Sequence, residues 1–125
     1  MLQTTKMVNV RKAVESFYTG SCTITEYQKV QNKNKSTGFV EVVVLENQPC
    51  RLSFNTIDTI VPQADGSSTI RQVTKVHLAP EIKVKPGSKL TITQNGVTND
   101  YKNSGEPAFY STHQEIILDI FKGWA

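Results

Sequence analysis

The last third of the chain restricts the fold most, because it has the pattern of consecutive strands joined by short turns. In residues 89–94 (KLTITQ), leucine and isoleucine alternate with polar residues, which is the period-two pattern of a half-buried strand. Asn95 and Gly96 follow, and both residue types tolerate the positive φ of a tight hairpin turn. The pattern therefore predicts a β-hairpin here, with residues 97–102 as the return strand.

The hairpin is followed by further strand patterns. Residues 104–107 (SGEP) have the composition of a second turn, and residues 108–110 form a short apolar run. Residues 113–121 alternate isoleucine and leucine with residues that are themselves partly apolar, which predicts a strand covered on both sides. We therefore expect residues 89–122 to form a four-stranded meander against which the rest of the chain closes.

Three more strands are expected upstream, at residues 21–30, 39–54 and 72–79, because these segments are rich in β-branched residues. The polar run at residues 32–38 (NKNKSTG) predicts a turn or an exposed hairpin tip between the first two. Pro49 cannot donate a hydrogen bond to a neighbouring strand, so a bend, a bulge or an edge position is expected near it.

A single helix is expected near the N-terminus, over residues 6–18. Val10, Ala13, Val14 and Phe17 recur at spacings of three and four, which puts them on one face of a helix. That face has two possible uses, either covering the strands of its own domain or serving as an arm to a neighbouring subunit.

These elements predict a mainly β fold: a small single-domain β-barrel of about six or seven strands with a short N-terminal helix, spanning residues 1–125. No apolar stretch approaches the roughly 20 residues of a membrane span, and no secretion signal is recognised, so no membrane contact is expected. The formal net charge of +3 is weak evidence for nucleic-acid binding.

The connection at residues 55–70 does not fit this simple plan. Connections above roughly 12–15 residues are usually functional or disordered. Residues 56–61 (TIDTIV) are almost entirely β-branched, whereas residues 63–68 (QADGSS) have the composition of a flexible turn. Asp58 and Asp65 are the charged residues of the segment, so it is poorly suited to holding phosphates. We expect a long inter-strand loop whose β-prone part has no partner in its own domain and pairs with another chain.

The sequence has few residues that could act in catalysis or bind a metal. His77 and His113 are the only histidines, and neither has metal-ligand spacing to a cysteine, an aspartate or the other histidine. A structural hydrogen bond is expected for His113. Cys22 and Cys50 form no CxxC motif and are expected to be small buried residues. The sequence therefore predicts no catalytic residue, no metal site, no cofactor and no enzymatic activity.

Several short segments, taken in order, resemble the head-completion (stopper) proteins of the head–tail connector in long-tailed bacteriophages, the siphovirus type that infects Gram-positive hosts. The resemblance extends from about residue 8 to residue 125. The segments are RLSF (51–54), QVTK (72–75), LAP (78–80), PGS (86–88), TQNG (93–96), YKNSG (101–105), Tyr110, HQE (113–115) and WA (124–125).

The resemblance implies a small β-barrel that assembles as a ring of six or twelve copies in the neck of the virion, after synthesis in the host cytoplasm. The ring would meet an adaptor protein above, below the portal, and the tail tube or a tail-terminator protein below. It would contact packaged double-stranded DNA without sequence specificity. A long loop would close the DNA exit channel, and the matching residues here are Asn55, Thr56, Ile57, Asp58, Thr59, Ile60, Val61, Gly66, Ser67 and Ser68.

Exposed basic and aromatic residues outside the loop are candidates for contact with neighbouring subunits or partners: Lys6, Arg11, Lys12, Lys33, Lys35 and Trp124. Two alternatives remain open. One is another neck protein such as a tail-terminator, and the other is a small barrel that binds single-stranded nucleic acid, for which the aromatic residues are few and are not interleaved with lysine or arginine.

Overall fold

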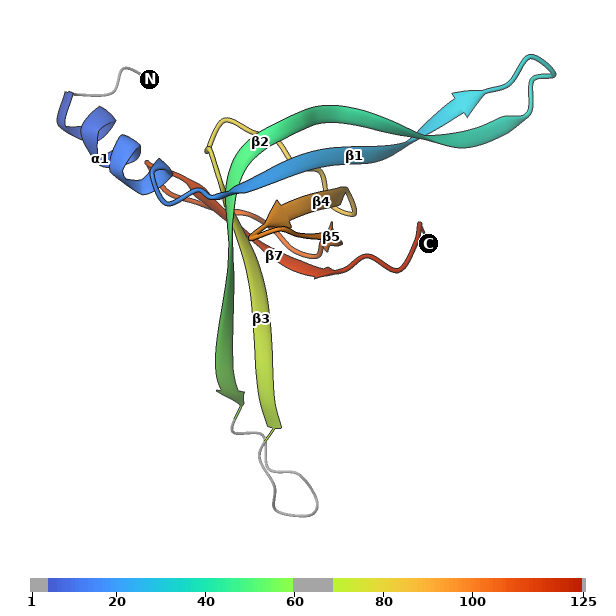
Figure 1. The fold of residues 1–125 in the computed structure, drawn as a ribbon. Coiled ribbons are helices and arrows are strands. Elements are labelled where there is room, and N and C mark those ends of the chain that lie inside the picture. The colour runs from blue at the N-terminus through green and yellow to red at the C-terminus, as the bar shows by residue number, and fades with distance from the viewer. Residues whose placement is uncertain (1–4, 60–68, 125) are drawn as a thin grey trace.

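The computed structural model describes residues 5–59 and 69–124, and it is mainly β (Figure 1). The elements within these ranges are α1 (Thr5–Glu15), β1 (Gly20–Gln31), β2 (Thr37–Thr59), β3 (Thr69–Leu78), β4 (Lys89–Gln94), β5 (Val97–Asn103), β6 (Ala108–Phe109) and β7 (Gln114–Ile120). The predicted mainly β class, with one short N-terminal helix, is confirmed.

Six of the strands close on themselves. The sheet order is β3-β2-β1-β4-β5-β7, every pairing is antiparallel, and β7 pairs back onto β3, for example Val76 opposite Ile116. We call this six-stranded arrangement the closed sheet. Closure removes the free edges that an open sheet of this size would expose, as expected for a small barrel.

The β4–β5 hairpin forms as the sequence predicts. Asn95 and Gly96 have φ values of 54° and 77°, the left-handed region that a tight hairpin turn requires at both positions. β4 and β5 then pair in continuous register from Gln94 opposite Val97 to Lys89 opposite Lys102.

The expected four-stranded meander over residues 89–122 is wrong in one respect. β5 pairs directly with β7, with Tyr101 opposite Ile120, instead of being separated from it by the short third strand. β6 pairs with the start of the same edge of β7, where Phe109 lies opposite Gln114. With only two residues, β6 is too short to separate β5 from β7, and the long C-terminal strand serves both.

The core fills the inside of the closed sheet. It is made mainly of aliphatic side chains from alternate residues of the strands. Its fully buried members include Ile24, Leu78, Leu90, Ile92 and Ile116. Burying each such side chain stabilises the fold by about 1.5–3 kcal/mol.

Cys22 and Cys50 also lie in this core as free thiols, as the sequence predicts. A hydrogen bond with Cys50 and burial both raise the pKa of the Cys22 thiol, which keeps it protonated.

Two buried amide side chains fasten the connection between β3 and β4 to the core. Gln114 Nε2 donates to the carbonyl oxygens of Ala79 at 2.8 Å and Ile82 at 2.5 Å. Asn103 Nδ2 donates to the carbonyl oxygen of Val84 at 3.1 Å. This segment has no strand partner, so these side-chain bonds help to satisfy its backbone carbonyl groups.

β2 is the longest strand and bends where the sequence places Pro49. The pairing with β1 shifts register between Cys22 and Ile24, where Asn47 of β2 takes a φ of 51°. The Asn47 N–H donates to Thr23 Oγ1 at 3.3 Å, so the residue out of register still has a partner. The expected irregularity near Pro49 is confirmed as a β-bulge, and β2 leaves the body of the domain in a different direction at each end (Figure 1).

α1 ends at Glu15, three residues before the expected end, and residues 16–17 continue as a turn. It stands at the side of the closed sheet (Figure 1), and the Arg11 guanidinium pairs with the Glu81 carboxylate of the β3–β4 connection. Phe17, which the sequence places on the apolar face, is 64% exposed. No helix within the described ranges is long and apolar enough to cross a membrane.

Candidate functional site

The β2–β3 hairpin contains the segment that the sequence singles out, and it projects beyond the closed sheet (Figure 1). β3 pairs with β7 only from Thr74 onward. Before Thr74, β3 pairs with β2 alone. We call the two-stranded ribbon of residues 55–59 and 69–73 the β2–β3 arm. Five residues of an extended strand span about 17 Å, so the arm reaches outside the body of the domain.

The residues expected to form a channel loop are divided by the structure. Those that form the end of β2 and lie opposite β3 are Asn55, Thr56, Ile57, Asp58 and Thr59. The expectation that this β-branched segment has no partner in its own domain is wrong, because β3 begins at Thr69 and supplies one. The remaining predicted residues lie outside the described ranges: Ile60, Val61, Gly66, Ser67 and Ser68.

The arm offers unpaired strand edges. Within residues 5–59 and 69–124, no strand lies along the outer side of either arm strand. Such edges present backbone N–H and C=O groups to any strand that approaches. Nearer the body, a side chain closes the β2 edge: Gln94 Oε1 accepts the Leu52 N–H at 2.8 Å and Gln94 Nε2 donates to the Leu52 carbonyl at 3.3 Å. The open edge of β2 therefore begins beyond Leu52.

A second arm leaves the other end of β2. β1 pairs with β4 only as far as Thr25, and beyond it residues 26–31 pair with residues 37–42 of β2 alone. We call this ribbon the β1–β2 arm. Its turn is held by its own polar groups, since Asn34 Oδ1 accepts the Ser36 N–H at 3.1 Å and the Ser36 hydroxyl at 2.5 Å.

The candidate interface residues are spread over distant parts of the fold. Three of them are exposed lysines: Lys12, Lys33 and Lys35. Arg11 is engaged within the chain by Glu81, and the side chain of Lys6 lies outside what the structure describes. Since α1 and the turn of the β1–β2 arm lie at opposite ends of the molecule, these residues do not form one surface (Figure 1).

Trp124, the sixth candidate, belongs to an aromatic cluster at the base of the β1–β2 arm. Its ring stacks on Tyr27 with 4.8 Å between centroids, and Tyr27 also stacks on Phe39 at 5.2 Å. Trp124 Nε1 donates to Glu41 Oε1 at 2.7 Å, and Lys89 Nζ lies 3.1 Å from the same oxygen. The cluster joins the C-terminal segment to the arm, and no sequence pattern signals it because its members lie far apart in the chain.

The electrostatics of this cluster follow from its contacts. The hydrogen bond from Trp124 lowers the pKa of the Glu41 carboxyl, and the hydrogen bond from Lys89 lowers it further. Because Tyr27 and Trp124 stack on each other and Lys89 pairs with Glu41, these rings and this charge are already used inside the chain.

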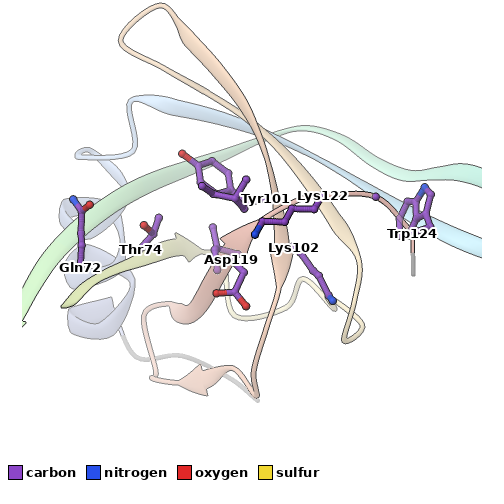
Figure 2. Close-up of a pocket in the computed structure, with 10 residues that line it drawn as sticks. Gln72, Thr74, Tyr101, Lys102, Asp119, Lys122 and Trp124 are labelled. Carbon is purple, nitrogen blue, oxygen red and sulfur yellow. The ribbon is translucent and has the colours of Figure 1, made fainter. Parts of the chain in front are cut away.

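A surface cavity of ≈ 620 Å³ lies between β3, β5, β7 and the C-terminal segment (Figure 2). Its polar lining includes Thr74, Lys102, Asp119 and Lys122, with Tyr101 on one wall. Among the described lining residues there is no histidine, cysteine or serine to act as base or nucleophile. The cavity is a recess of mixed polar and apolar lining beside the start of the β2–β3 arm.

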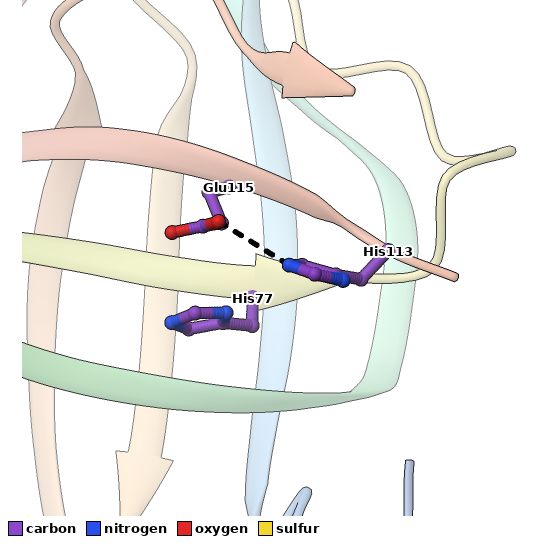
Figure 3. Close-up of side chains that lie close together, drawn as sticks. All are labelled: His77, His113 and Glu115. Atoms are coloured by element: carbon purple, nitrogen blue, oxygen red, sulfur yellow. Dashed lines mark hydrogen bonds and ion pairs between the residues drawn. The ribbon is translucent and has the colours of Figure 1, made fainter. Parts of the chain in front are cut away.

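A compact cluster of His77, His113 and Glu115 lies on the outer side of the closed sheet (Figure 3). His77 lies opposite Glu115 across the β3–β7 pairing, and His113 precedes Glu115 by two residues, so all three share one face. His113 Nε2 lies 3.3 Å from Glu115 Oε2, and Ser53 Oγ lies 3.1 Å from His77 Nε2. Thr112 Oγ1 lies 3.0 Å from His113 Nδ1, so His113 makes the structural hydrogen bonds expected of it.

The cluster could not be predicted from spacing in the sequence, because His77 and His113 come together only through the pairing of β3 with β7. The two rings are 5.5 Å apart between centroids. Burial is the main cause that lowers the pKa of His77, which favours its neutral form. Both histidines also line an apolar cavity beneath α1, together with Val14 and Phe17.

The described chain is thus a mainly β protein with a closed antiparallel sheet, one short helix and two projecting arms. No protein-family model matches the sequence, and no curated protein matches it. A similar solved structure is that of the phage-like element PBSX protein xkdH from Bacillus subtilis, with a TM-score of 0.47 and 10% identity over 80% of this chain and 91% of that chain. A TM-score and an identity this low transfer neither fold nor function.

Proposed function

We propose that this chain is a non-catalytic structural protein of the head–tail connector of a long-tailed bacteriophage. It forms a ring of subunits below the portal and adaptor, closes the DNA exit channel after packaging and provides the surface to which the tail attaches. The sequence resemblance suggests the role. The observation that carries it is the β2–β3 arm, a ribbon that extends beyond the closed sheet with both outer edges unpaired among the described residues.

The arm is suited to meeting copies of itself. When subunits are arranged around an axis with their arms directed inward, the outer edge of β2 in one arm can pair with the outer edge of β3 in the next. Alternate residues of a strand direct their backbone groups to the same side, so a five-residue edge forms about two to four hydrogen bonds. Each contributes about 0.5–1.5 kcal/mol net, and every junction around the ring adds the same amount.

The hairpin changes the mechanism that a single loop would give. A lone extended segment must lose its conformational freedom when it meets its neighbour. Here Thr56 and Ile57 are already paired with Gln72 and Arg71, so part of that ordering is complete before assembly. The closed channel is then a set of preformed ribbons that separate along their shared edges when DNA leaves.

The charges of the arm favour release of DNA. Between Asn55 and Ile70 the sequence has two aspartates and neither lysine nor arginine, and Arg71 is the single cationic residue of the β2–β3 arm. Affinity for duplex DNA comes mainly from cationic side chains at phosphates. A segment with a single cationic residue obstructs DNA sterically and does not bind it tightly, which suits a structure that must open at ejection.

The register allows a direct test in the phage that encodes the chain. Replacing residues 57–71 with Asn-Gly leaves Thr56 opposite Gln72 across a two-residue turn and removes most of the arm. Heads that package DNA with this variant should lose it before tails attach, measured as the ratio of full to empty heads by electron microscopy. Heads that stay as full as those of the unaltered phage would contradict a channel-closing role.

The control replaces the turn of the other arm and leaves its paired strands in place. Gln31 lies opposite Thr37, so replacing residues 32–36 with Asn-Gly keeps the pairing of the β1–β2 arm. This variant should retain DNA. An image of the neck supplies an independent check, because density of this protein should cross the channel axis in full heads and withdraw from it after ejection.

A further inference from the structure

We propose that His77, His113 and Glu115 bind a first-row divalent metal ion, with Zn²⁺ as the preferred occupant. The nitrogen and oxygen atoms that these side chains offer lie within 4.8 Å of one another. Two imidazoles and one carboxylate form a ligand set that Zn²⁺ takes in proteins, with a water molecule completing the tetrahedron. The proposal is independent of a role in the phage neck.

The strand register builds the site. His77 and Glu115 are directly opposed on β3 and β7, and Glu115 and His113 are two residues apart along the chain. Ligand atoms about 2.0–2.2 Å from a tetrahedral Zn²⁺ are about 3.3–3.6 Å from one another. His113 Nε2 and Glu115 Oε2 are already 3.3 Å apart. His77 supplies the third ligand atom, which lies within 4.8 Å of the other two.

Neighbouring hydroxyl groups orient the two imidazoles. Thr112 Oγ1 lies 3.0 Å from His113 Nδ1, which leaves Nε2 directed at Glu115 and free to bind the ion. Ser53 Oγ lies 3.1 Å from His77 Nε2, which leaves Nδ1 for the metal. Hydrogen bonds to the non-ligating nitrogen fix ring orientation in established zinc sites.

The surroundings combine a favourable and an unfavourable feature. Apolar residues of α1, including Val10 and Val14, line a surface cavity together with the two histidines and make the neighbourhood of the site partly apolar. Lys75 opposes a cation, since its Nζ lies 3.9 Å from Glu115 Oε1, and Arg51 lies opposite His77 on β2. These positive charges lower the expected affinity for Zn²⁺. A variant that removes one of them should therefore bind Zn²⁺ more tightly.

The experiment uses the full-length protein without a histidine tag, since the chain has only these two histidines. Zn²⁺ binding is measured by competition with a chromophoric chelator, and Co²⁺ is added in parallel as a spectroscopic probe. We expect one ion per chain and the visible absorption of tetrahedral Co²⁺ without a sulfur charge-transfer band. Ca²⁺ and Mg²⁺ should not compete, because they prefer sites made of oxygen ligands.

The variants separate binding by this cluster from adventitious binding. His77→Asn and His113→Asn should each weaken Zn²⁺ at least about tenfold, whereas Glu106→Gln, an exposed carboxylate elsewhere, should leave it unchanged. Lys75→Gln should tighten binding about threefold or more, because it removes the opposing charge. Circular dichroism confirms that each variant is folded.

A second readout reports the link between β3 and β7. Zn²⁺ at about 100 times its Kd should raise the Tm of the unaltered protein by about 5–15 °C and should not raise that of His77→Asn. Unchanged affinity in the two histidine variants, or a Co²⁺ spectrum with thiolate bands, would overturn the proposal. Absence of measurable Zn²⁺ binding by both the unaltered protein and Lys75→Gln would overturn it as well.

Discussion

The two arms of β2 are built in the same way and are held differently. The β1–β2 arm is fixed at its base, where Trp124 stacks on Tyr27 and donates to Glu41. Lys85 Nζ lies 3.6 Å from Glu26 Oε1 and adds a second link to the body. The turn of the β1–β2 arm also has hydrogen bonds among its own residues. The C-terminal segment and the β3–β4 connection therefore both restrain this arm.

Within the described ranges, the strands of the β2–β3 arm pair only with each other, because the pairing of β3 with β7 begins at Thr74. Gln94 restrains it at its root through Leu52. The tips also differ in charge. Residues 28–38 of the first arm contain three lysines and no carboxylate, whereas residues 55–70 of the second contain two aspartates and no lysine or arginine, and Arg71 follows them.

The difference shows how one strand can serve two purposes. A ribbon clamped by its own chain has fewer free groups for a partner, and a ribbon clamped only at its root keeps its edges available. In the proposed assembly the β1–β2 arm is a preformed projection that docks by its side chains. The β2–β3 arm docks by its backbone.

The largest stability effect is expected at the root of the β2–β3 arm. Gln94→Ala removes the side chain that satisfies both backbone groups of buried Leu52, so unfolding free energy should fall by about 1–3 kcal/mol. Urea denaturation gives the magnitude. Hydrogen exchange gives the location, and faster exchange should be concentrated in residues 51–54 and in the β2–β3 arm.

Gln28→Ala is the matched control on the other arm, because Gln28 is exposed and its amide contacts only the side chain of Glu26 among the described residues. Stability should change by less than about 0.5 kcal/mol. An equal loss of stability in both variants would mean that the root of the β2–β3 arm has no special restraint.

The next effect is expected at the bulge that separates the two arms. Asn47 has a φ of 51°, and a β-branched residue there is strained, so Asn47→Val should cost about 1–2 kcal/mol. Asn47→Gly keeps access to this conformation and should cost less. If valine and glycine are equally tolerated in urea denaturation, the bend of β2 does not depend on this residue.

The elements of the fold were predictable where local patterns decide them. Asn95-Gly96 marks the β4–β5 hairpin, and Pro49 marks the irregular part of β2. The pairing of β5 with β7 was not predictable in this way, because β6 intervenes in the sequence and has only two residues. Which strands become neighbours depends on closure of the sheet, a long-range property.

The same limit explains what was missed around the candidate sites. The β-branched residues after Asn55 were recognised as unusual, but their partner was not, since Thr69 and Ile70 were assigned to the connection. His77 and Glu115 meet only through the β3–β7 pairing, and Tyr27 meets Trp124 only because the chain returns to the arm. Composition identifies such residues, and register decides which of them meet.

A smaller effect is expected from releasing the β1–β2 arm. Trp124→Ala removes the stacking on Tyr27, which should cost about 0.5–1.5 kcal/mol. Hydrogen exchange should become faster in residues 26–42 and stay unchanged in the β2–β3 arm. Phe109→Ala, an aromatic residue that is 64% exposed on β6, is the control and should alter neither arm. Faster exchange in both arms of Trp124→Ala would mean that they are not restrained separately.

The smallest expected effect is a pH-dependent loosening of the same clamp, which the chain's only tryptophan can report. Contacts with Trp124 and Lys89 lower the pKa of Glu41 below its ordinary value of 4.5. A lowered folded-state pKa means that the stabilisation is present above pH 4.5 and is lost as pH falls through the lowered value.

Fluorescence of Trp124 should therefore stay constant from pH 7 to about pH 5 and change below pH 4.5, while far-ultraviolet circular dichroism remains unchanged. Glu41→Gln keeps an acceptor for the indole N–H and lacks the titrating group, so this transition should disappear. Glu46→Gln, at another carboxylate of β2, should retain it. A transition that persists in Glu41→Gln would show that a different group holds the C-terminal segment against the β1–β2 arm, and the contrast between the two arms would then need another cause.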